Sequence, residues 1–301
     1  MARVDPRGAK LAARFRALRA FSFPLSLLPI VVAAAVVRPV DEWRWDTLAA
    51  SLGAVMLFHA AGNMINDCFD YIRGVDIGRE TYRGRLGAVL VAGELEVSDM
   101  AYGALVCLLL AALPMAYLAG ALGAGVLWFA VPAVFALYAY TGPPFRLKHR
   151  GLGELVIFPV FGPALMLGAA YAQTVEVEWR VLMLSLPVGF ATTAVLAGNN
   201  LRDFDEDREA GIRTLAHALG RRGAGALYAA LVSAFALGIG AMGASGLGPW
   251  QLGLVPALLP LHFRAMGSAL KGEAAVDVDA RAVRFESLVL IVVLAIYMFS
   301  W

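Results

Sequence analysis

Residues 47–76 read TLAASLGAVMLFHAAGNMINDCFDYIRGVD. Residues 47–66 carry no charged side chain, and this is the length of helix, roughly 20 residues, that crosses a bilayer core about 30 Å thick. Carboxamides and carboxylates follow directly, beginning with Asn63. The stretch therefore predicts a membrane-spanning helix that carries a cluster of polar side chains at its end.

The composition of the whole chain agrees with a membrane protein. Of its 301 residues, 60% are apolar and 16% are charged, and the mean hydropathy is +0.71. Soluble domains are usually about 45–50% apolar and about 25% charged, so the composition excludes a disordered chain and argues against a water-soluble enzyme. The 25 basic and 23 acidic residues give no signature of a nucleic-acid partner, and two cysteines form no disulfide framework.

Segmentation at charges and at Gly/Pro clusters predicts an all-α integral membrane protein, a nine-transmembrane-helix bundle that forms one domain over residues 1–301. The first span is expected to be retained, because no small-residue cleavage pattern follows the basic N-terminal residues. The expected spans are residues 20–38, 47–66, 100–119, 121–140, 152–173, 181–200, 223–245, 247–263 and 285–301.

The basic residues predict the orientation of these spans. With the N-terminus in the cytoplasm, 22 of the 25 Lys and Arg residues fall on the cytoplasmic side. Only Arg38, Arg44 and Arg180 fall on the other side. This asymmetry predicts a multi-pass protein of the cell (inner) membrane with a cytoplasmic N-terminus.

Two of the loops on the basic side continue an apolar helix directly into carboxamides and carboxylates. The first acidic motif contains Asn66, Asp67, Asp70 and Asp76, and the second contains Asn199, Asn200, Asp203 and Asp207. Within each motif, residues four apart, such as Asp203 and Asp207, share one face of a helix. Two such clusters at the same membrane level favour a functional site over two solvated helix caps.

The chemistry of these side chains predicts metal-assisted binding of a polyphosphate. Oxygen ligands without His or Cys are typical of Mg²⁺, which takes one or two carboxylates and completes its coordination with water and substrate phosphates. Basic side chains nearby are candidates for direct phosphate contacts. These candidates are Arg19, Arg146, Lys148, Arg202 and Arg208.

The two motifs resemble those of the UbiA superfamily of intramembrane prenyltransferases. Residues 199–220, NNLRDFDEDREAGIRTLAHALG, are similar to the branch that prenylates 1,4-dihydroxy-2-naphthoate in menaquinone biosynthesis and to its animal relatives. Residues 140–144, 151–154 and 171–173 resemble the same branch. The loop from Ile77 to Gly93 departs from the pattern of the branch, which bears on the identity of the acceptor.

The resemblance implies a nine-helix bundle around a central cavity open to the cytoplasmic side. It implies transfer of an isoprenyl chain from a polyprenyl diphosphate to an aromatic acceptor, in a site that faces the cytoplasm, with Mg²⁺ as cofactor. The implied metal ligands and catalytic acids are Asn66, Asp67, Asp70, Asp76, Asp203 and Asp207, assisted at the diphosphate by Asn199 and Asn200. The implied contacts to the acceptor or the carbocation are Tyr140, Tyr171 and Glu154.

Two kinds of alternative remain open from the sequence. Within the family, the acceptor could be 4-hydroxybenzoate, homogentisate, haem, a chlorophyllide or a glycerol phosphate lipid. Outside it, an ion or proton-coupled transporter also places Asp and Asn in membrane helices, although relay carboxylates usually lie near the midplane. His59 is interpreted as a hydrogen-bonded core residue, Cys68 has no assigned role, and Asp277 and Asp279 are interpreted as solvated surface. No pattern in the sequence sets the oligomeric state.

Overall fold

The computed structural model describes residues 6–74, 89–274 and 277–300, and these residues form helices, turns and loops with no strand. The all-α prediction is therefore confirmed for the described part of the chain. The α-helices are α1 (Pro6–Ala17), α2 (Pro24–Val37), α3 (Trp45–Ile72), α4 (Val97–Leu122), α5 (Leu127–Ala139), α6 (Gly153–Pro159), α7 (Leu165–Thr174), α8 (Trp179–Arg202), α9 (Phe204–Glu209), α10 (Leu215–Ala244), α11 (Phe263–Leu270) and α12 (Val278–Met298). Short 3₁₀ or π segments cover Ala20–Ser22, Val40–Glu42, Ala124–Val126, Lys148–Arg150, Val160–Ala164 and Trp250–His262.

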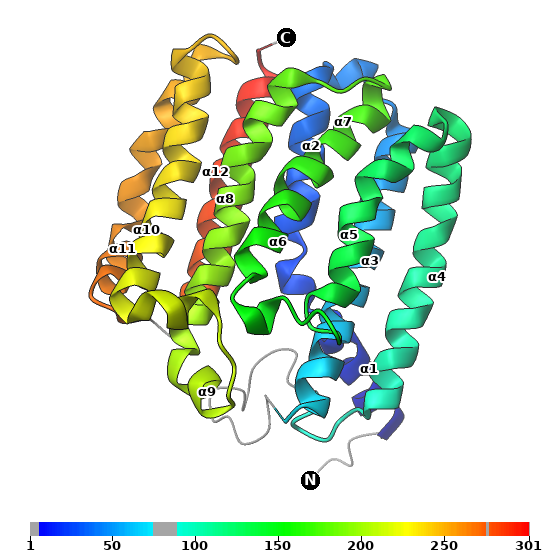
Figure 1. Ribbon diagram of the computed structural model, residues 1–301. Coiled ribbons are helices and arrows are strands. Elements are labelled where there is room, and N and C mark those ends of the chain that lie inside the picture. The colour runs from blue at the N-terminus through cyan, green and yellow to red at the C-terminus, as the bar shows by residue number, and fades with distance from the viewer. Residues whose placement is uncertain (1–5, 75–88, 275–276, 301) are drawn as a thin grey trace.

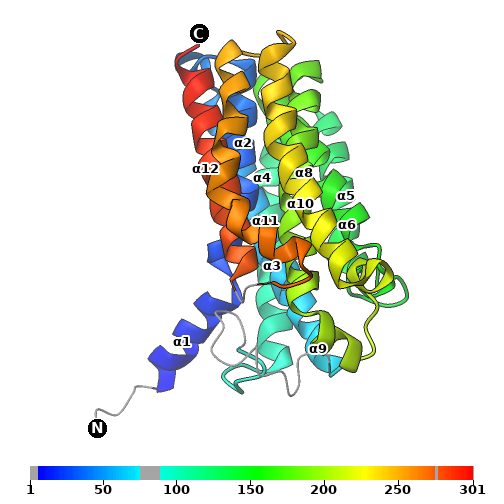
Figure 2. The same ribbon diagram turned by 90° about the vertical axis from the view of Figure 1, so that its left-hand side faces the viewer.

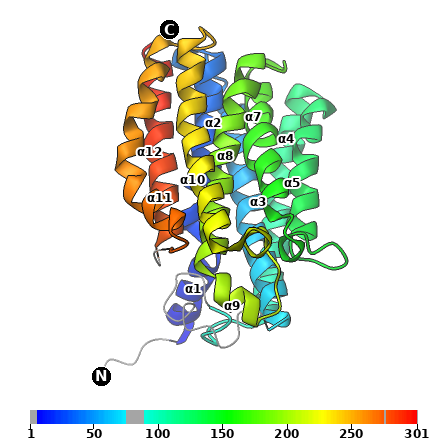
Figure 3. The same ribbon diagram turned by 60° about the vertical axis from the view of Figure 1, so that its left-hand side comes forward.

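The long helices stand side by side in one bundle (Figure 1). The N-terminal part of the chain, the end of α3 and the short helix α9 lie at one end of the bundle, and the C-terminus lies at the other (Figures 1 and 3). Helix α1 extends away from the bundle at the first of these ends (Figure 2). The described residues of both acidic motifs belong to this end, which is called the acidic end below.

Within the part of the chain that the structure describes, five helical segments are long and apolar enough to cross a membrane: α3, α4, α8, α10 and the continuous segment Gly153–Thr174. A sixth is formed if Gly8–Ser22 and Pro24–Val37, which meet at a bend of 50°, count as one broken span. These agree with six of the expected spans. The membrane-protein prediction is thus supported by five or six spans, and the full set of nine stays a prediction.

The other three expected spans coincide with helical segments that are shorter or more charged. Residues 121–140 contain α5, and residues 285–301 overlap α12, whose first half carries Arg281, Arg284 and Glu286. Residues 247–263 form the 3₁₀ segment Trp250–His262, which runs into α11. Pro256 and Pro260 explain that geometry, because proline has no N–H to donate to the preceding turn of an α-helix.

The segment Gly153–Thr174 is interrupted by a π-helical turn at Val160–Ala164, which follows Pro159 and contains Pro163. At this turn Gly162 lies against α8, and a Cβ on it would be 2.6 Å from the carbonyl oxygen of Ser185 and 2.9 Å from Cα of Gly189. Small residues permit such close approach of membrane helices. The turn therefore fixes the wall formed by α6 and α7 closely against α8.

Candidate active site

A cavity of about 600 Å³ runs through the interior of the bundle. Its lining comes from α2–α9, the start of α12 and short connecting segments between these helices. Along α3 it extends from Ser51 to Asn66, a rise of about 22 Å at 1.5 Å per residue. The lining side chains at its acidic end are mostly polar or charged: Arg19, Asn63, Asn66, Tyr140, Lys148, Asn199, Asn200, Arg202, Asp203, Asp207 and Asp279.

The second acidic motif lies where α8 passes into α9, and its carboxylates, Asp203 and Asp207, both line the cavity. The backbone N–H of Asp207 donates to the carbonyl oxygen of Asp203 at 2.8 Å, so the two residues keep the helical spacing expected from the sequence. His217 at the start of α10 holds α9 in place. Its Nε2 donates to the carbonyl oxygen of Phe204 at 2.8 Å, and its ring stacks on that of Phe204 at 4.4 Å.

Arg202 joins the second motif to the start of α12. Its Nε and Nη2 donate to the two carboxylate oxygens of Asp203 at 2.7 and 2.8 Å, and its Nη1 lies 2.6 Å from Oδ2 of Asp279. Asp279 lines the cavity, so its interpretation as solvated surface was wrong. The first turn of α12 packs beside the end of α8, a tertiary contact that no local pattern predicts. Asp277 is at the surface as expected, in an ion pair with Arg281 at 2.8 Å.

The described carboxylates of the first motif pair with cations from other parts of the chain. Asp67 is buried and accepts a hydrogen bond from Arg19. Asp70, 1% exposed, lies 2.6 Å from Nζ of Lys148 and 3.0 Å from Nε2 of His149. Neither carboxylate lines the cavity, whereas Arg19 and Lys148 do. The buried acids thus hold two positive side chains at the cavity wall, and Asp76 lies outside the described residues.

The backbone at Arg19 is strained in a way that serves this arrangement. Arg19 has φ of 52° and ψ of 45°, a left-handed conformation that a residue with a Cβ rarely adopts. It lies between α1 and the short helical turn Ala20–Ser22 that leads into α2. Such strain is concentrated at functional sites in proteins, and here it accompanies the placement of the guanidinium group between Asp67 and the cavity.

The remaining candidates divide between the cavity and its surroundings. Tyr140 lines the cavity. Glu154 does not line it, but its Oε1 accepts a hydrogen bond of 2.8 Å from the cavity residue Asn200. Tyr171 packs on Phe129 at 5.4 Å, near the end of α7 that is remote from the acidic end. The cavity lining does not include Tyr171, Arg146 or Arg208, and Arg208 is exposed.

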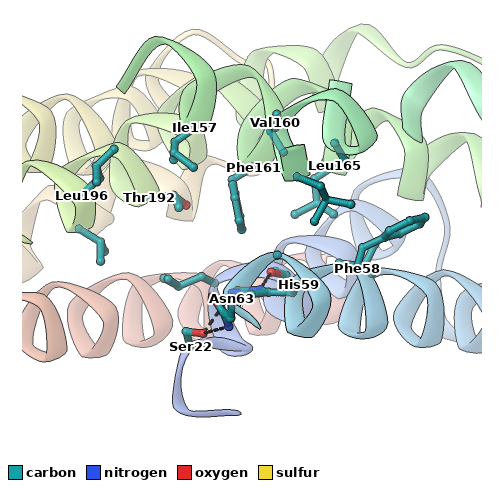
Figure 4. A pocket seen from close by; sticks show the side chains of 18 of the residues that line it. Ser22, Phe58, His59, Asn63, Ile157, Val160, Phe161, Leu165, Thr192 and Leu196 are labelled. Atoms are coloured by element: carbon teal, nitrogen blue, oxygen red, sulfur yellow. Dashed lines mark hydrogen bonds between the residues drawn. The ribbon is translucent and has the colours of Figure 1, made fainter. Parts of the chain in front are cut away.

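A polar group on the wall of the cavity was not predicted as part of the site. His59 lies in hydrogen-bond contact with Ser22 through Nε2, at 3.0 Å, and with Ser26 through Nδ1. All three residues line the cavity, with Phe161 on the facing wall (Figure 4). His59 is hydrogen-bonded as expected. Its access to the cavity depends on the packing of α2 against α3, which gives no signal in the sequence around His59.

The oxygen donors at the acidic end suit a hard cation. The described residues contain no group of three or more His, Cys, Asp or Glu side chains arranged to hold a metal. Oδ1 of Asn66 and Oδ1 of Asn199 are, however, buried cavity atoms without a hydrogen-bond partner. Together with Asp203 and Asp207 they provide carboxamide and carboxylate oxygens from both motifs, which fits Mg²⁺ when water and phosphate complete its coordination.

Comparison with known sequences relates the chain to prenyltransferases. A sequence model of the UbiA prenyltransferase family matches residues 26–300. The chain is 33% identical to the 1,4-dihydroxy-2-naphthoate octaprenyltransferase of Mycobacterium tuberculosis over 83% of this chain and 84% of that protein. It is 29% identical to the 2-carboxy-1,4-naphthoquinone phytyltransferase of Synechocystis over 79% of this chain and 76% of that one.

A further relative is the UbiA prenyltransferase domain-containing protein 1 homolog of Drosophila melanogaster, 32% identical over 75% of this chain. The match spans 63% of the length of the fly protein and 62% of its zebrafish counterpart.

Solved structures show the same fold. A UbiA homolog from Archaeoglobus fulgidus, bound to GPP and Mg²⁺, superposes with a TM-score of 0.71 at 16% identity and covers 95% of this chain and 99% of its own. The apo structure of a UbiA homolog from Aeropyrum pernix superposes with a TM-score of 0.65 at 19% identity, over 92% and 96% of the two chains. At these identities the likeness concerns the fold.

Proposed function

Because the chain belongs to the UbiA prenyltransferase family, we propose that this membrane prenyltransferase transfers an isoprenyl chain from a polyprenyl diphosphate to 1,4-dihydroxy-2-naphthoate, as in menaquinone biosynthesis. One observation carries the proposal. Asn66 of the first acidic motif and Asn199, Asn200, Asp203 and Asp207 of the second line the polar end of one cavity whose remaining wall is largely apolar. The polar end suits a diphosphate group, and the apolar part suits an isoprenyl chain and an aromatic ring.

Three cations at the polar end account for diphosphate binding. Arg19, Lys148 and Arg202 line the cavity, and each is paired with a carboxylate of an acidic motif. These pairs fix the positive groups before substrate arrives, which reduces the ordering needed on binding. Charge-assisted hydrogen bonds from Arg and Lys to phosphate oxygens are stronger than neutral ones.

Asn66, Asn199, Asp203 and Asp207 would hold Mg²⁺ between the two motifs. The ion would supply neutralisation of the negative charge that develops on the leaving diphosphate. The presence of Mg²⁺ with GPP in the A. fulgidus homolog supports this choice of metal. Asp70, which is paired with Lys148 and His149, would position the lysine at the diphosphate, and Asp76 stays a predicted ligand.

The part of the cavity away from the acidic end protects the carbocation formed when the diphosphate leaves. Its walls include Phe58, Phe129, Phe161 and Leu165, and such walls keep out the water that would otherwise trap the cation as an alcohol. The ring face of Tyr140, at the polar end, would stabilise the cation electrostatically. With the acidic end in the cytoplasm, as the basic residues predict, the diphosphate of the donor enters from that side. The isoprenyl chain of the donor and that of the product stay in the bilayer.

The names of two relatives favour the naphthoate acceptor. The M. tuberculosis protein is named for 1,4-dihydroxy-2-naphthoate and the Synechocystis protein for a carboxylated naphthoquinone. The motif at residues 199–220 resembles the same branch. A glycerol phosphate lipid, by contrast, offers no aromatic ring for the aromatic side chains of the cavity to contact.

The test is turnover by the purified protein in detergent or nanodiscs. It receives a labelled polyprenyl diphosphate, Mg²⁺ and one acceptor at a time, namely 1,4-dihydroxy-2-naphthoate, 4-hydroxybenzoate, homogentisate or a glycerol phosphate lipid. We expect a prenylated naphthalene product that disappears when EDTA removes the metal. If a prenylated product forms with only one of the other acceptors, that acceptor is the substrate instead. Ion flux in vesicles without any prenylated product would favour the transporter alternative.

A further inference from the structure

Ser22, Ser26 and His59, called the His59 cluster here, form a hydrogen-bonded part of the cavity wall whose chemistry the prenyl transfer described above does not use. His59 lies on α3, seven residues before Asn66, which places it about 10 Å deeper along the helix axis than the diphosphate end. Ser26 comes from α2 and is 1% exposed. The cluster thus lies beyond the diphosphate, at the depth where an acceptor ring would meet the donor.

The hydrogen bonds of the cluster determine which nitrogen of His59 carries a proton. The hydroxyl of Ser22 donates to the carbonyl oxygen of Arg19 at 2.8 Å, so its oxygen can only accept from Nε2 of His59, 3.0 Å away. Nε2 therefore carries a hydrogen, and Nδ1 of the neutral ring is an acceptor. The hydroxyl of Ser26 must then donate to Nδ1.

This pattern leaves the oxygen of Ser26 ready to accept a further hydrogen bond. Its hydrogen is directed at Nδ1 of His59, and its lone pairs lie on a side chain that lines the cavity. The imidazole ring contacts two aromatic rings, with centroid distances of 5.5 Å to Phe23 and 5.6 Å to Phe161. Phe161 projects from the facing wall toward His59 (Figure 4). A hydroxylated aromatic ring bound in the cavity would pack against these apolar rings, and its hydroxyl could donate a hydrogen bond to Ser26.

We infer that Ser26 and His59 form a proton relay that converts a ring hydroxyl of the aromatic acceptor into a phenolate for attack on the donor. The inference rests on the proposed prenyl transfer and adds the residues that activate the acceptor. The acceptor hydroxyl gives its proton to the oxygen of Ser26, while the proton of Ser26 passes to Nδ1 of His59. Ser22 accepts from Nε2–H throughout.

The step balances over one turnover. The phenolate ring carbon forms a bond to C1 of the donor, and the C1–oxygen bond breaks with its electron pair leaving on the diphosphate. The ring regains aromaticity by losing the proton of that carbon to an oxygen of the departing diphosphate, or by losing carbon dioxide if the carbon carries a carboxylate, and the electron pair of the broken bond leaves a negative charge on the ring oxygen. The imidazolium gives its proton back through Ser26 to that oxygen, so the relay ends neutral as it began.

The test compares His59→Gln with the wild type. Glutamine can accept from Ser26 and donate to Ser22, so it preserves the hydrogen bonds of a structural histidine, but it cannot take a proton. Ser51→Ala is the matched control, since Ser51 lines the same cavity from the same helix and its hydroxyl bonds only to the carbonyl oxygen of Thr47 at 2.8 Å. Each protein is assayed with a series of acceptors whose hydroxyl groups become progressively more acidic through ring fluorination.

With the unmodified acceptor, kcat of His59→Gln should fall about a hundredfold, the lower range for loss of a general base. Donor KM and Mg²⁺-dependent donor binding should stay at wild-type values. The loss should shrink as the acceptor hydroxyl becomes more acidic, because such an acceptor needs less help to ionise. Ser51→Ala should match the wild type throughout.

Two outcomes would overturn the inference while leaving the proposed function intact. One is wild-type kcat in His59→Gln, and the other is a loss that stays constant across the acceptor series, as a packing defect would produce. If His59→Gln fails to bind donor, Ser26→Ala, which keeps the imidazole, must show the same dependence on acceptor acidity. Absence of any prenylated product from the wild-type protein would instead overturn the proposed function, and the relay with it.

Discussion

At the residue scale, the second acidic motif contains carboxylates with opposite surroundings. Asp203 and Asp207 line the cavity, whereas Asp205, between them in the sequence, has 69% of its side chain exposed and pairs with Arg221. These three aspartates, at alternate positions of residues 203–207, therefore give a matched comparison within one short segment.

We predict that Asp207→Asn lowers kcat by roughly 10²–10³-fold, the cost of removing one group that stabilises developing charge in a transition state. Asp203→Asn should fall in the same range, while Asp205→Asn should remain within about twofold of the wild type. Steady-state turnover with saturating donor measures all three variants. Equal losses at Asp205 and Asp207 would show that the cavity lining does not select the functional acids.

The pairing of Asp70 with Lys148 predicts a measurable coupling between them. Asp70→Ala leaves the lysine charge without its buried partner and should lower the free energy of unfolding by about 3 kcal/mol. Lys148→Met should also destabilise, and the double variant should recover about 1 kcal/mol or more of the summed loss. Thermal unfolding in detergent provides the comparison, and strictly additive losses would contradict the ion pair.

The sequence was sufficient to find the residues of both acidic motifs, because each follows an apolar helix at helical spacing. It could not show that Asp70 is turned to Lys148 and His149, since those partners come from a loop 78 and 79 residues away. Asp279 and His59 were missed as cavity residues for the same reason. Their surroundings are made by helices that meet only in the folded bundle.

At the scale of the elements, the contact between Gly162 and α8 determines the shape of one cavity wall. We predict that Gly162→Ala destabilises the protein by about 1–3 kcal/mol, the usual penalty for overpacking, because the new Cβ would lie 2.6 Å from a backbone oxygen. Gly53→Ala on α3 is the control. No atom lies within 4 Å of its added Cβ, so it should be neutral or stabilising by up to about 1 kcal/mol.

Thermal unfolding of the two glycine variants in the same detergent measures this difference. A Gly162→Ala protein as stable as Gly53→Ala would mean that α6 and α7 are free to move away from α8. Turnover should fall together with stability in Gly162→Ala, since Phe161 and Val160 of the same turn line the cavity.

The helices themselves were largely predictable from their apolar runs, and the breaks were not. The expected span at residues 152–173 agrees closely with Gly153–Thr174, yet the π turn at Val160–Ala164 depends on the fit against Gly189. The expected helix at residues 247–263 is a 3₁₀ segment because two prolines remove backbone donors. Apolar periodicity reports length and burial, while backbone geometry depends on prolines and neighbours.

At the scale of the whole molecule, the two ends of the bundle should face different compartments. Glu209 is exposed at the acidic end, and Ser245 is exposed at the other end of α10. In a Cys68→Ser, Cys107→Ser background, a cysteine introduced at position 245 should react with a membrane-impermeant maleimide in intact cells. A cysteine at position 209 should react only after the cells are opened, and the reverse pattern would contradict the cytoplasmic orientation of the site.

The central claim is that residues of the two acidic motifs bind one diphosphate from opposite sides. Equilibrium binding of a labelled, non-hydrolysable prenyl thiodiphosphate tests this claim most directly. Binding to the wild-type protein should require Mg²⁺. Asn66→Ala and Asp207→Ala, one from each motif, should each weaken it at least tenfold, whereas Asp205→Ala should not. Wild-type affinity in either cavity variant, or full binding with EDTA present, would contradict a diphosphate site shared by the two motifs.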